Sequence, residues 1–239
     1  MQSRNFRLQK VGDIKWLERN YKFQKIAFSL DELVVLDATK ENKCIEKFAE
    51  TVSELVNDVF IPIAAGGGIR SLEDAELLFK SGADKIVLNS VLHENSPLVH
   101  NLVKIYGAQS IVASIDYKII SGTPAVFIND GQTQLDYDLS SYLRYLHQLN
   151  IGEIYLNSID QDGTGFGYDM EVIENASKEI SVPLIIAGGA GNEAHLKTGL
   201  ELPGVSAVAT ANLFNFMGNG LPNARQKILD EGENIAQWN

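Results

Sequence analysis

The stretch Ile61-Pro62-Ile63-Ala64-Ala65-Gly66-Gly67 returns later in the chain as Pro183-Leu184-Ile185-Ile186-Ala187-Gly188-Gly189. Each copy is a short apolar run that ends in two glycines. A continuous apolar run of this length is typical of a parallel strand covered on both faces, and the glycines mark a turn into the next element. The two copies therefore predict buried parallel strands at matching places in two similar halves.

Apolar runs of this kind alternate with amphipathic segments along the whole chain. Such alternation predicts a parallel α/β fold with right-handed crossovers. The expected strands are Glu32–Ala38, Ile61–Gly67, Lys85–Ser90, Ser110–Asp116, Glu153–Asp160, Pro183–Gly189 and Ala207–Asn212. The expected helices are Asp13–Phe28, Asn42–Asn57, Leu72–Ser81, Pro97–Tyr106, Asp138–Leu149, Asp169–Glu179 and Glu193–Leu200.

Three strand ends keep nearly the same spacing between the halves. The separations are 123 residues for Asp37 and Asp160, and 122 residues for Gly67 and Gly189 and for Ser90 and Asn212. Two half-barrels, about 1–109 and 110–239, would form a single (β/α)8 barrel domain of the TIM type. The repeat places the counterpart of the strand ending at Asp116 before Met1. We therefore expect seven strands of an eight-stranded barrel, without the first.

The composition excludes several classes of protein. The chain has 239 residues, of which 45% are hydrophobic, so it can build a full core and is not a disordered chain. Its net charge of −11, without a basic patch, argues against a nucleic-acid partner. No apolar run is long enough to cross a membrane, and the one cysteine, Cys44, fits the reducing cytoplasm. The four histidines are scattered, so we expect neither a metal site nor a cofactor.

Glycine-rich turns follow the expected strands at matching places in the two halves. Glycines let the backbone approach an anion, and the N-terminus of the following helix supplies N–H donors. Neither turn carries a dinucleotide or P-loop motif. The pattern predicts two phosphate cups, for a ligand with a phosphate at each end. The cups would be formed by Gly66–Asp74 with Asn89 and Ser90 in the first half, and by Gly163, Gly188–Gly191, Ala211 and Asn212 in the second.

Asp116 ends an apolar strand and is a candidate for acid–base chemistry. A carboxyl group held among apolar neighbours can have a raised pKa and exchange protons near neutrality. The alternative is that it caps a helix or forms an ion pair in a loop. The same two roles, acid–base chemistry or a structural cap or ion pair, are open for Asp37, Asp160 and Asp162, which lie at or just after other strand ends. The spacing of Asp160–Glu171 also resembles a calcium loop, but a strand precedes it where an EF-hand has a helix.

Taken together, these segments resemble the HisF family, the cyclase subunit of imidazole glycerol phosphate synthase in histidine biosynthesis. The resemblance implies a (β/α)8 barrel with a two-fold repeat that binds PRFAR, a substrate with two phosphates. Ammonia from a partner glutaminase would pass through the barrel, and the products would be imidazole glycerol phosphate and AICAR. The resemblance runs from Asn5 to Phe216 and is carried by Gly12-Asp13, Asp31–Asp37, Ala65–Ile69, Ser81–Lys85, Ser114–Asp116, Gly152–Ile154, Ser158–Gly163 and Ile186–Gly191.

The resemblance also implies roles for the candidate residues. Asp116 matches the catalytic acid of the family, and Asp84 matches a residue at the glutaminase interface. A charged gate at the ammonia entrance is matched by Glu32, Lys85 and Glu153. Charged groups in a barrel floor are costly unless they are paired, so a gate explains them better than packing does. The resemblance places one phosphate of the substrate in the first cup and the other in the second. The residues it implies are Gly68, Asn89 and Ser90 for one phosphate, and Gly163, Gly189, Ala211 and Asn212 for the other.

The sequence departs from the family at its start. The family's general base, a second Asp, and the fourth member of the gate, an Arg, lie on the first strand, which the chain as written lacks. Asn157, and Asn212 in place of Ser, are milder differences. We expect the chain as written to be nearly inactive and about 17 restored upstream residues to recover activity. Two alternatives stay open: an ammonia-using amidation subunit that acts on a sugar in surface-polysaccharide biosynthesis, and a non-catalytic scaffold that activates a glutaminase.

Overall fold

The computed structural model describes residues 29–40, 42–211 and 219–237. Their strands form one nine-stranded sheet, in which seven strands run parallel in the order β1-β2-β3-β4-β7-β8-β9. The expected helix Asp13–Phe28 and the cup residue Asn212 lie outside the described residues. The parallel strands are β1 (Leu33–Leu36), β2 (Ile63–Gly66), β3 (Lys85–Leu88), β4 (Ile111–Ile120), β7 (Glu153–Ser158), β8 (Leu184–Ala187) and β9 (Val205–Val208).

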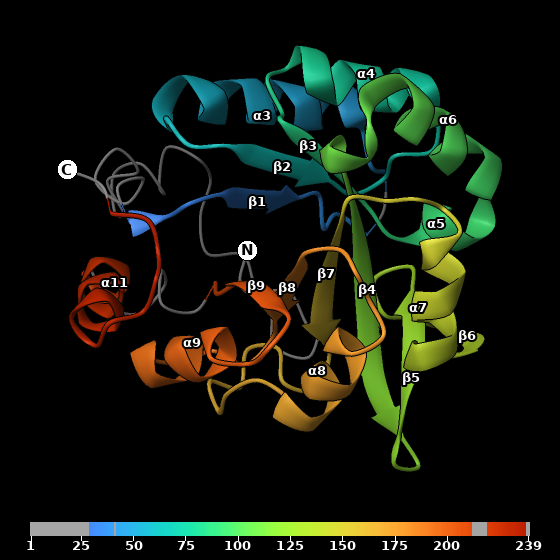
Figure 1. Cartoon of the computed structure of the whole chain (residues 1–239). Helices are drawn as coiled ribbons and strands as arrows, with labels where there is room; N and C mark the ends of the chain where they lie inside the picture. The colour runs from blue at the N-terminus through green and yellow to red at the C-terminus, as the bar shows by residue number, and fades with distance from the viewer. Residues whose placement is uncertain (1–28, 41, 212–218, 238–239) are drawn as a thin grey trace.

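The parallel part of the sheet curls strongly, with β1 and β9 at its two ends (Figure 1). Within the part of the chain that the structure describes, β1 pairs only with β2, and β9 pairs only with β8. The described sheet is therefore an open, barrel-like α/β sheet. Each of the seven expected strands is present in it, in the expected order along the chain.

The sequence did not predict the hairpin that extends β4. β4 continues past Asp116 and pairs antiparallel with β5 (Thr123–Ile128), which pairs with β6 (Thr133–Asp138). Ser121 and Gly122, at φ 50° and 83°, form the turn between β4 and β5. Positive φ at both central residues gives the tight turn whose twist matches two antiparallel strands. This hairpin extends beyond the body of the sheet (Figure 1).

Helices cover the outer face of the curled sheet. Several begin at a capping side chain: Ser71 forms a capping box with Asp74, and Asn95, Asp138 and Asn192 accept from backbone amides of the next turn. The short α5 and the C-terminal α11 were not expected. The helices are α3 (Ile45–Asp58), α4 (Leu72–Lys80), α5 (Ser90–Glu94), α6 (Ser96–Tyr106), α7 (Leu139–His147), α8 (Met170–Ser177), α9 (Glu193–Leu200) and α11 (Gly220–Asp230).

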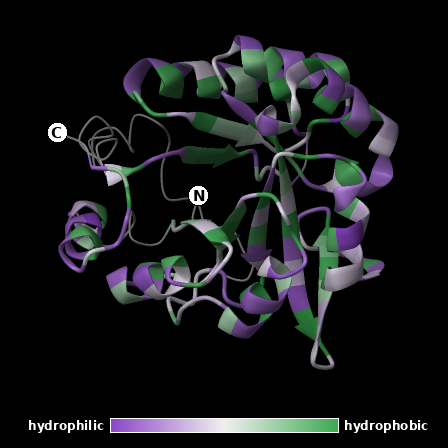
Figure 2. Cartoon of the chain, in the orientation of Figure 1, coloured by the Kyte–Doolittle hydropathy of each residue, from purple (hydrophilic) through white to green (hydrophobic). Residues whose placement is uncertain are grey.

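The sheet has a hydrophobic cluster on each face. The large core lies between the outer face and the helices, whose hydrophobic residues face the sheet while hydrophilic ones face outward (Figure 2). A small inner cluster consists of Ala64, Val87 and Val112, with Val34 and Tyr155 packed against it. Strand periodicity explains this division, because successive side chains point to opposite faces of the sheet. Among the described helices, none is long and apolar enough to cross a membrane.

Candidate functional site

A cavity of about 1310 Å³ occupies the inside of the curled sheet. Glu32 lines it next to the start of β1, and Asp116 and Asn157 line it near the carboxyl ends of β4 and β7. On β7, the partly buried Glu153, Tyr155 and Asn157 alternate with fully buried residues that face the helices. The interior of the sheet therefore connects the two ends of the strands, and the carboxyl ends are where α/β folds build their sites.

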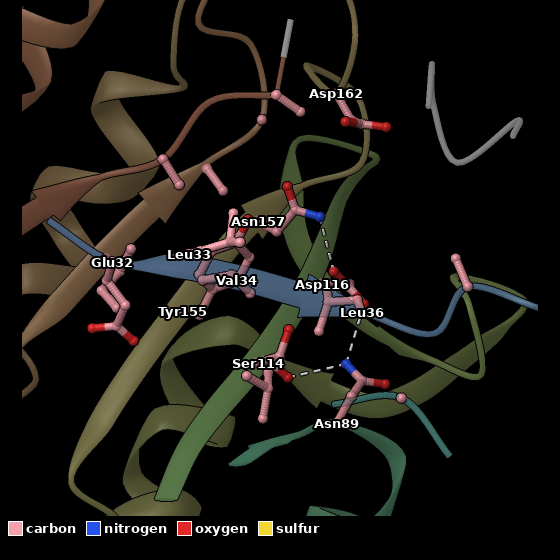
Figure 3. Close-up of a pocket in the computed structure, with 18 of the residues that line it drawn as sticks. Glu32, Leu33, Val34, Leu36, Asn89, Ser114, Asp116, Tyr155, Asn157 and Asp162 are labelled. Atoms are coloured by element: carbon pink, nitrogen blue, oxygen red, sulfur yellow. Dashed lines mark hydrogen bonds between the residues drawn. The ribbon is translucent and has the colours of Figure 1, made fainter. Parts of the chain in front are cut away.

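Asp116 is a buried carboxylate at this site, with 8% of its surface exposed. Asn157 Nδ2 donates a hydrogen bond to Asp116 Oδ1 at 3.0 Å, and Asn89 Nδ2 donates to Asp116 Oδ2 at 3.1 Å. One amide comes from β7 and the other from the residue that follows β3, and they approach the carboxylate from opposite sides (Figure 3). Sequence analysis singled out Asp116 and Asn89, but it noted Asn157 only as a departure from the family.

The environment of Asp116 changes its acidity. Desolvation by burial raises the pKa of Asp116 from 3.8 to about 7, although the hydrogen bond from Asn157 opposes the rise. The charges of Asp130 and Asp162 raise the pKa further, and the hydrogen bond from Asn89 lowers it. A carboxyl group with a pKa near neutrality can both release and accept a proton at physiological pH. This favours acid–base chemistry at Asp116 over the capping role considered above.

The other candidate aspartates have different surroundings. Asp37 lines the cavity, and its Oδ1 accepts a hydrogen bond from the Thr39 amide at 2.9 Å. Asp162 also lines the cavity and lies at the mouth near Asn157 (Figure 3). Asp160 is not among the residues that line the cavity; its Oδ2 accepts from the Ile119 amide at 2.9 Å. Asp160 therefore holds the extension of β4 in place.

The first expected phosphate cup comes together at the cavity, and the helix that follows it is capped in part. Gly68, Asn89 and Ser90 all line the cavity. The amides of Arg70 and Ser71 donate to Asp74 Oδ2 at 2.8 and 2.9 Å, and the Asp74 amide donates to Ser71 Oγ at 3.1 Å. The capping box of α4 thus uses some of the N–H groups at this turn, and the role of the others toward an anion stays a prediction.

Ser90 in this cup is linked to the hairpin turn. Its hydroxyl donates to Asn129 Oδ1 and accepts from the Asn129 amide, both at 3.0 Å. Asn89 is also held, because its Nδ2 donates to the Ser114 carbonyl at 3.0 Å as well as to Asp116. Asn129 belongs to the segment that the sequence analysis did not recognise as a hairpin, so its contact with the site was missed.

The second cup is formed by tightly packed glycine turns. Gly163 and Gly189 have φ of 71° and 112°, and both line the cavity with Ala211. A Cβ on Gly189 would lie 2.0 Å from the Gly167 carbonyl oxygen, which explains why this position is a glycine. At the start of α9, the Gly191 amide donates to His195 Nδ1 at 3.2 Å, so this helix end is also partly capped.

The three predicted gate residues form an ion cluster at the amino-terminal end of the strands. Lys85 Nζ lies 2.8 Å from Glu32 Oε2 and 2.7 Å from Glu153 Oε1. Burial lowers the pKa of Lys85, but the hydrogen bonds that Lys85 donates to Glu153 and Glu32 outweigh this effect, so the pKa is raised and Lys85 stays charged. Glu32 Oε1 is buried without a hydrogen-bond partner among the described residues. The cluster therefore has two carboxylates for one cation.

Asp84, the predicted interface residue, lies beside this cluster. Its Oδ2 accepts from the Ile63 amide at 2.8 Å, and its own amide donates to the Ile63 carbonyl. These bonds hold the loop before β2, where Phe60 is 87% exposed. An exposed aromatic ring next to a charged cavity entrance is a feature of binding surfaces, although a single exposed ring is also common on monomers.

Comparison with known proteins adds to this geometry. The model of a family described as "Histidine biosynthesis protein" matches residues 9–219. Over 237 residues the chain is 43% identical to the "Putative imidazole glycerol phosphate synthase subunit hisF2" of Parasynechococcus marenigrum, which covers 99% of this chain and 88% of that protein. It is 34% identical to subunit HisF of Dictyoglomus turgidum over 223 residues (93% and 86%), and to that of Pyrobaculum aerophilum over 228 residues (95% and 88%).

Proposed function

The chain belongs to the HisF family of histidine biosynthesis proteins, and we propose that it is an ammonia-using synthase subunit of the cyclase type. In this proposal it converts PRFAR and ammonia to imidazole glycerol phosphate and AICAR, and a partner glutaminase supplies the ammonia. The observation that carries the proposal is that one cavity is lined both by Asp116, a buried carboxylate with a pKa of about 7, and by Glu32, which belongs to the ion cluster at the amino-terminal end of the strands.

In the proposed mechanism, Asp116 transfers protons. With a pKa of about 7, it is present in both protonation states at neutral pH. It can therefore release or accept a proton as ammonia adds to the substrate and the imidazole ring closes. Because Asp116 is buried, little bulk water reaches the proton-transfer group, which strengthens the electrostatic effect of a fixed charge.

The ion cluster at the floor would control the entry of ammonia. Lys85 holds Glu32 and Glu153 together across the amino-terminal end of the cavity. A shift of the Lys85 side chain would open a path past the inner cluster of small apolar residues toward Asp116. Apolar walls favour neutral ammonia over the ammonium ion, because burying an unpaired charge is costly. The glutaminase would bind at this end, over Asp84 and Phe60.

The two glycine-rich cups would bind the phosphates of PRFAR. Gly68, Asn89 and Ser90 would hold one, and Gly163, Gly189, Ala211 and Asn212 would hold the other. Gly68 and Gly189 both have positive φ, so their backbones can approach an anion without interference from a Cβ. The mouth of the cavity also contains carboxylates, so we expect the bound phosphates to depend on amide donors and on nearby cations such as Lys43, which lines the cavity.

A second candidate function is favoured by one observation. Of the carboxylates that line the described cavity, Asp116 alone is buried. Cyclisation of PRFAR calls for an acid and a base, whereas addition of ammonia to a nucleotide- or phospho-sugar could use one proton-transfer group. A related amidation subunit of surface-polysaccharide biosynthesis is therefore the alternative.

Substrate turnover tests the two candidates against each other. The protein encoded by the whole reading frame, including any codons in frame upstream of Met1, is mixed with PRFAR and an ammonium salt, and with nucleotide-sugars in parallel. Formation of imidazole glycerol phosphate and AICAR supports the cyclase. Consumption of a nucleotide-sugar alone supports the amidation subunit. Activation of the glutaminase without binding of either substrate would instead indicate a scaffold.

A further inference from the structure

We propose that Asn157 is a positioning residue that, together with Asn89, clamps the Asp116 carboxylate and fixes the direction in which it exchanges its proton. The proposal rests on the proposed role of Asp116, but its first test does not require turnover. It is argued from the hydrogen bonds, the strand register and the space around Asn157.

The strand register places Asn157 directly beside Asp116. The two residues are partners in the parallel pairing of β4 with β7, and their side chains face the same cavity. Asn157 Nδ2 donates to Asp116 Oδ1 at 3.0 Å, while Asn89, the residue after β3, donates to Oδ2 at 3.1 Å (Figure 3). Each carboxylate oxygen thus accepts one amide hydrogen bond. The remaining lone pairs are available to a ligand in the cavity.

A glycine provides the space for the Asn157 carboxamide. Gly188, at φ 87°, follows β8, and a Cβ there would lie only 3.0 Å from Asn157 Oδ1 and 2.6 Å from the Ser158 carbonyl oxygen. Any larger residue would press on the oxygen end of the Asn157 side chain. The nitrogen end then points to Asp116, which matches the donor that an ionised carboxylate requires.

The charged groups around Asp116 make the donor from Asn157 important. Asp130, in the β5–β6 turn, and Asp162, in the loop after β7, both disfavour a negative charge on Asp116. Tyr155, on the same face of β7, is electrostatically coupled to Asp116 and has a raised pKa through burial, so it remains neutral. Among the described residues, the side-chain amides of Asn157 and Asn89 favour the ionised form. Loss of either donor shifts the proton equilibrium toward the neutral acid.

Titration of Asp116 by NMR tests the clamp directly. In protein with ¹³C-labelled aspartate, the Asp116 carboxyl signal is assigned by its loss in Asp116→Asn. In Asn157→Leu, which keeps the volume and removes the donor, we expect the titration midpoint to rise by about one pH unit or more. The matched control, Asn101→Leu on the exposed face of α6, should leave the midpoint unchanged. A midpoint in Asn157→Leu within about 0.3 unit of the wild type would overturn the proposal.

A second variant keeps the test decisive if Asn157→Leu does not fold. Asn157→Asp has nearly the same shape, so it fits against Gly188, but it replaces the donor with a carboxylate 3 Å from Asp116. Two carboxylates this close share one proton, so two separated midpoints are expected, one of them well above 7. Two independent midpoints at ordinary aspartate values would contradict the clamp.

Turnover then separates this inference from the proposed function. If the wild type converts PRFAR, the limb of its pH–rate profile that reports Asp116 should shift in Asn157→Leu by the amount found by NMR, with partial return in Asn157→Ser. A profile that does not shift while the wild type is active rejects the positioning role alone. If the Asp116 midpoint shifts in Asn157→Leu but the wild-type protein does not convert PRFAR, the cyclase function is rejected and the positioning role of Asn157 is retained.

Discussion

Glu153 and Asn157 lie on the same face of β7, and each bonds to a different functional group. Glu153 accepts hydrogen bonds from Lys85 at the floor of the cavity, and Asn157 donates to Asp116 at its mouth. Four residues of strand separate them, which is about 13 Å. One strand therefore sets the distance between the proposed entrance for ammonia and the proposed proton-transfer group.

Replacement of Asp116 should stop the reaction without unfolding the protein. Asp116→Asn keeps the shape but cannot exchange a proton, so we expect turnover of the substrate to fall by roughly 10²- to 10⁴-fold. Binding of the substrate, measured by calorimetry, should change much less than turnover does, because Asp116 is not among the proposed phosphate-binding residues. Full turnover in Asp116→Asn would exclude Asp116 as the proton-transfer group.

The stability of the protein should depend on pH through Asp116. Its pKa rises from 3.8 to about 7 on folding, so between these values the folded protein binds more protons than the unfolded chain. The free energy of unfolding contributed by this group is therefore highest at low pH and falls as the pH rises toward 7, by up to roughly 4 kcal/mol. Urea unfolding at pH 5 and pH 8 should show a steeper fall for the wild type than for Asp116→Asn. If the free energy of unfolding falls equally between pH 5 and pH 8 in the wild type and in Asp116→Asn, the pKa of Asp116 is not raised in the folded protein.

Removal of the cation from the floor cluster should destabilise the protein. In Lys85→Met the half-buried Glu32 and Glu153 lose their shared partner, and we expect a loss of about 1–3 kcal/mol in urea unfolding, with solvent screening included. Lys80→Met is the control, because Lys80 forms an exposed ion pair with Glu76 and its loss should change stability much less than Lys85→Met does. Equal losses in the two variants would show that the cluster is no stronger than a surface pair.

Arg225 and Asp31 join the C-terminal helix to the segment before β1. Two guanidinium nitrogens of Arg225 each lie 2.8 Å from an Asp31 oxygen, and Arg225 is largely buried while Asp31 is exposed. Arg225→Met should therefore lower the free energy of unfolding by about 1–3 kcal/mol, and Asp31→Asn by less. Thermal unfolding of both variants measures the difference. A larger loss in Asp31→Asn would contradict this account of the pair.

Phe60 should contribute to binding of the glutaminase. Phe60→Asp places a charge next to Asp84 at the proposed interface, and we expect the dissociation constant to rise at least about 10-fold. Phe166→Asp is the matched control, since Phe166 is 83% exposed but lies in the loop that follows β7, near the carboxyl ends of the strands. Titration calorimetry with the glutaminase compares them. Equal weakening by the two variants would place the interface elsewhere.

The sequence predicted the positions of the parallel strands along the chain well, because a continuous apolar run is typical of a strand that is covered on both faces. Strand ends were less accurate: the expected strand Glu153–Asp160 ends at Ser158, since the last residues turn away from β8 to form the mouth. The hairpin beyond Asp116 was missed, although Ser121-Gly122 and Asn129-Asp130-Gly131 are turn sequences. The expected strands were continuous apolar runs, whereas β6 is mostly polar and was therefore not predicted as a strand.

The candidate site was predicted in part for a similar reason. Asp116 could be predicted because a carboxylate is rare at the end of a buried strand, whereas Glu32, Lys85 and Glu153 were expected only from the resemblance to the HisF family. Asn157 was not predicted, because a polar residue near a strand end has no specific meaning until its neighbour across the sheet is known. The capping of α4 by Asp74 was also not predicted, and it uses some of the amides at the expected cup.

The most direct test of the central claim is the conversion of PRFAR by the protein encoded by the whole reading frame together with its glutaminase. The proposal predicts that imidazole glycerol phosphate and AICAR form in equal amounts with either glutamine or an ammonium salt, and that neither forms with Asp116→Asn. If PRFAR remains unchanged with both nitrogen sources while the wild-type protein is folded, the chain is not a cyclase of this pathway.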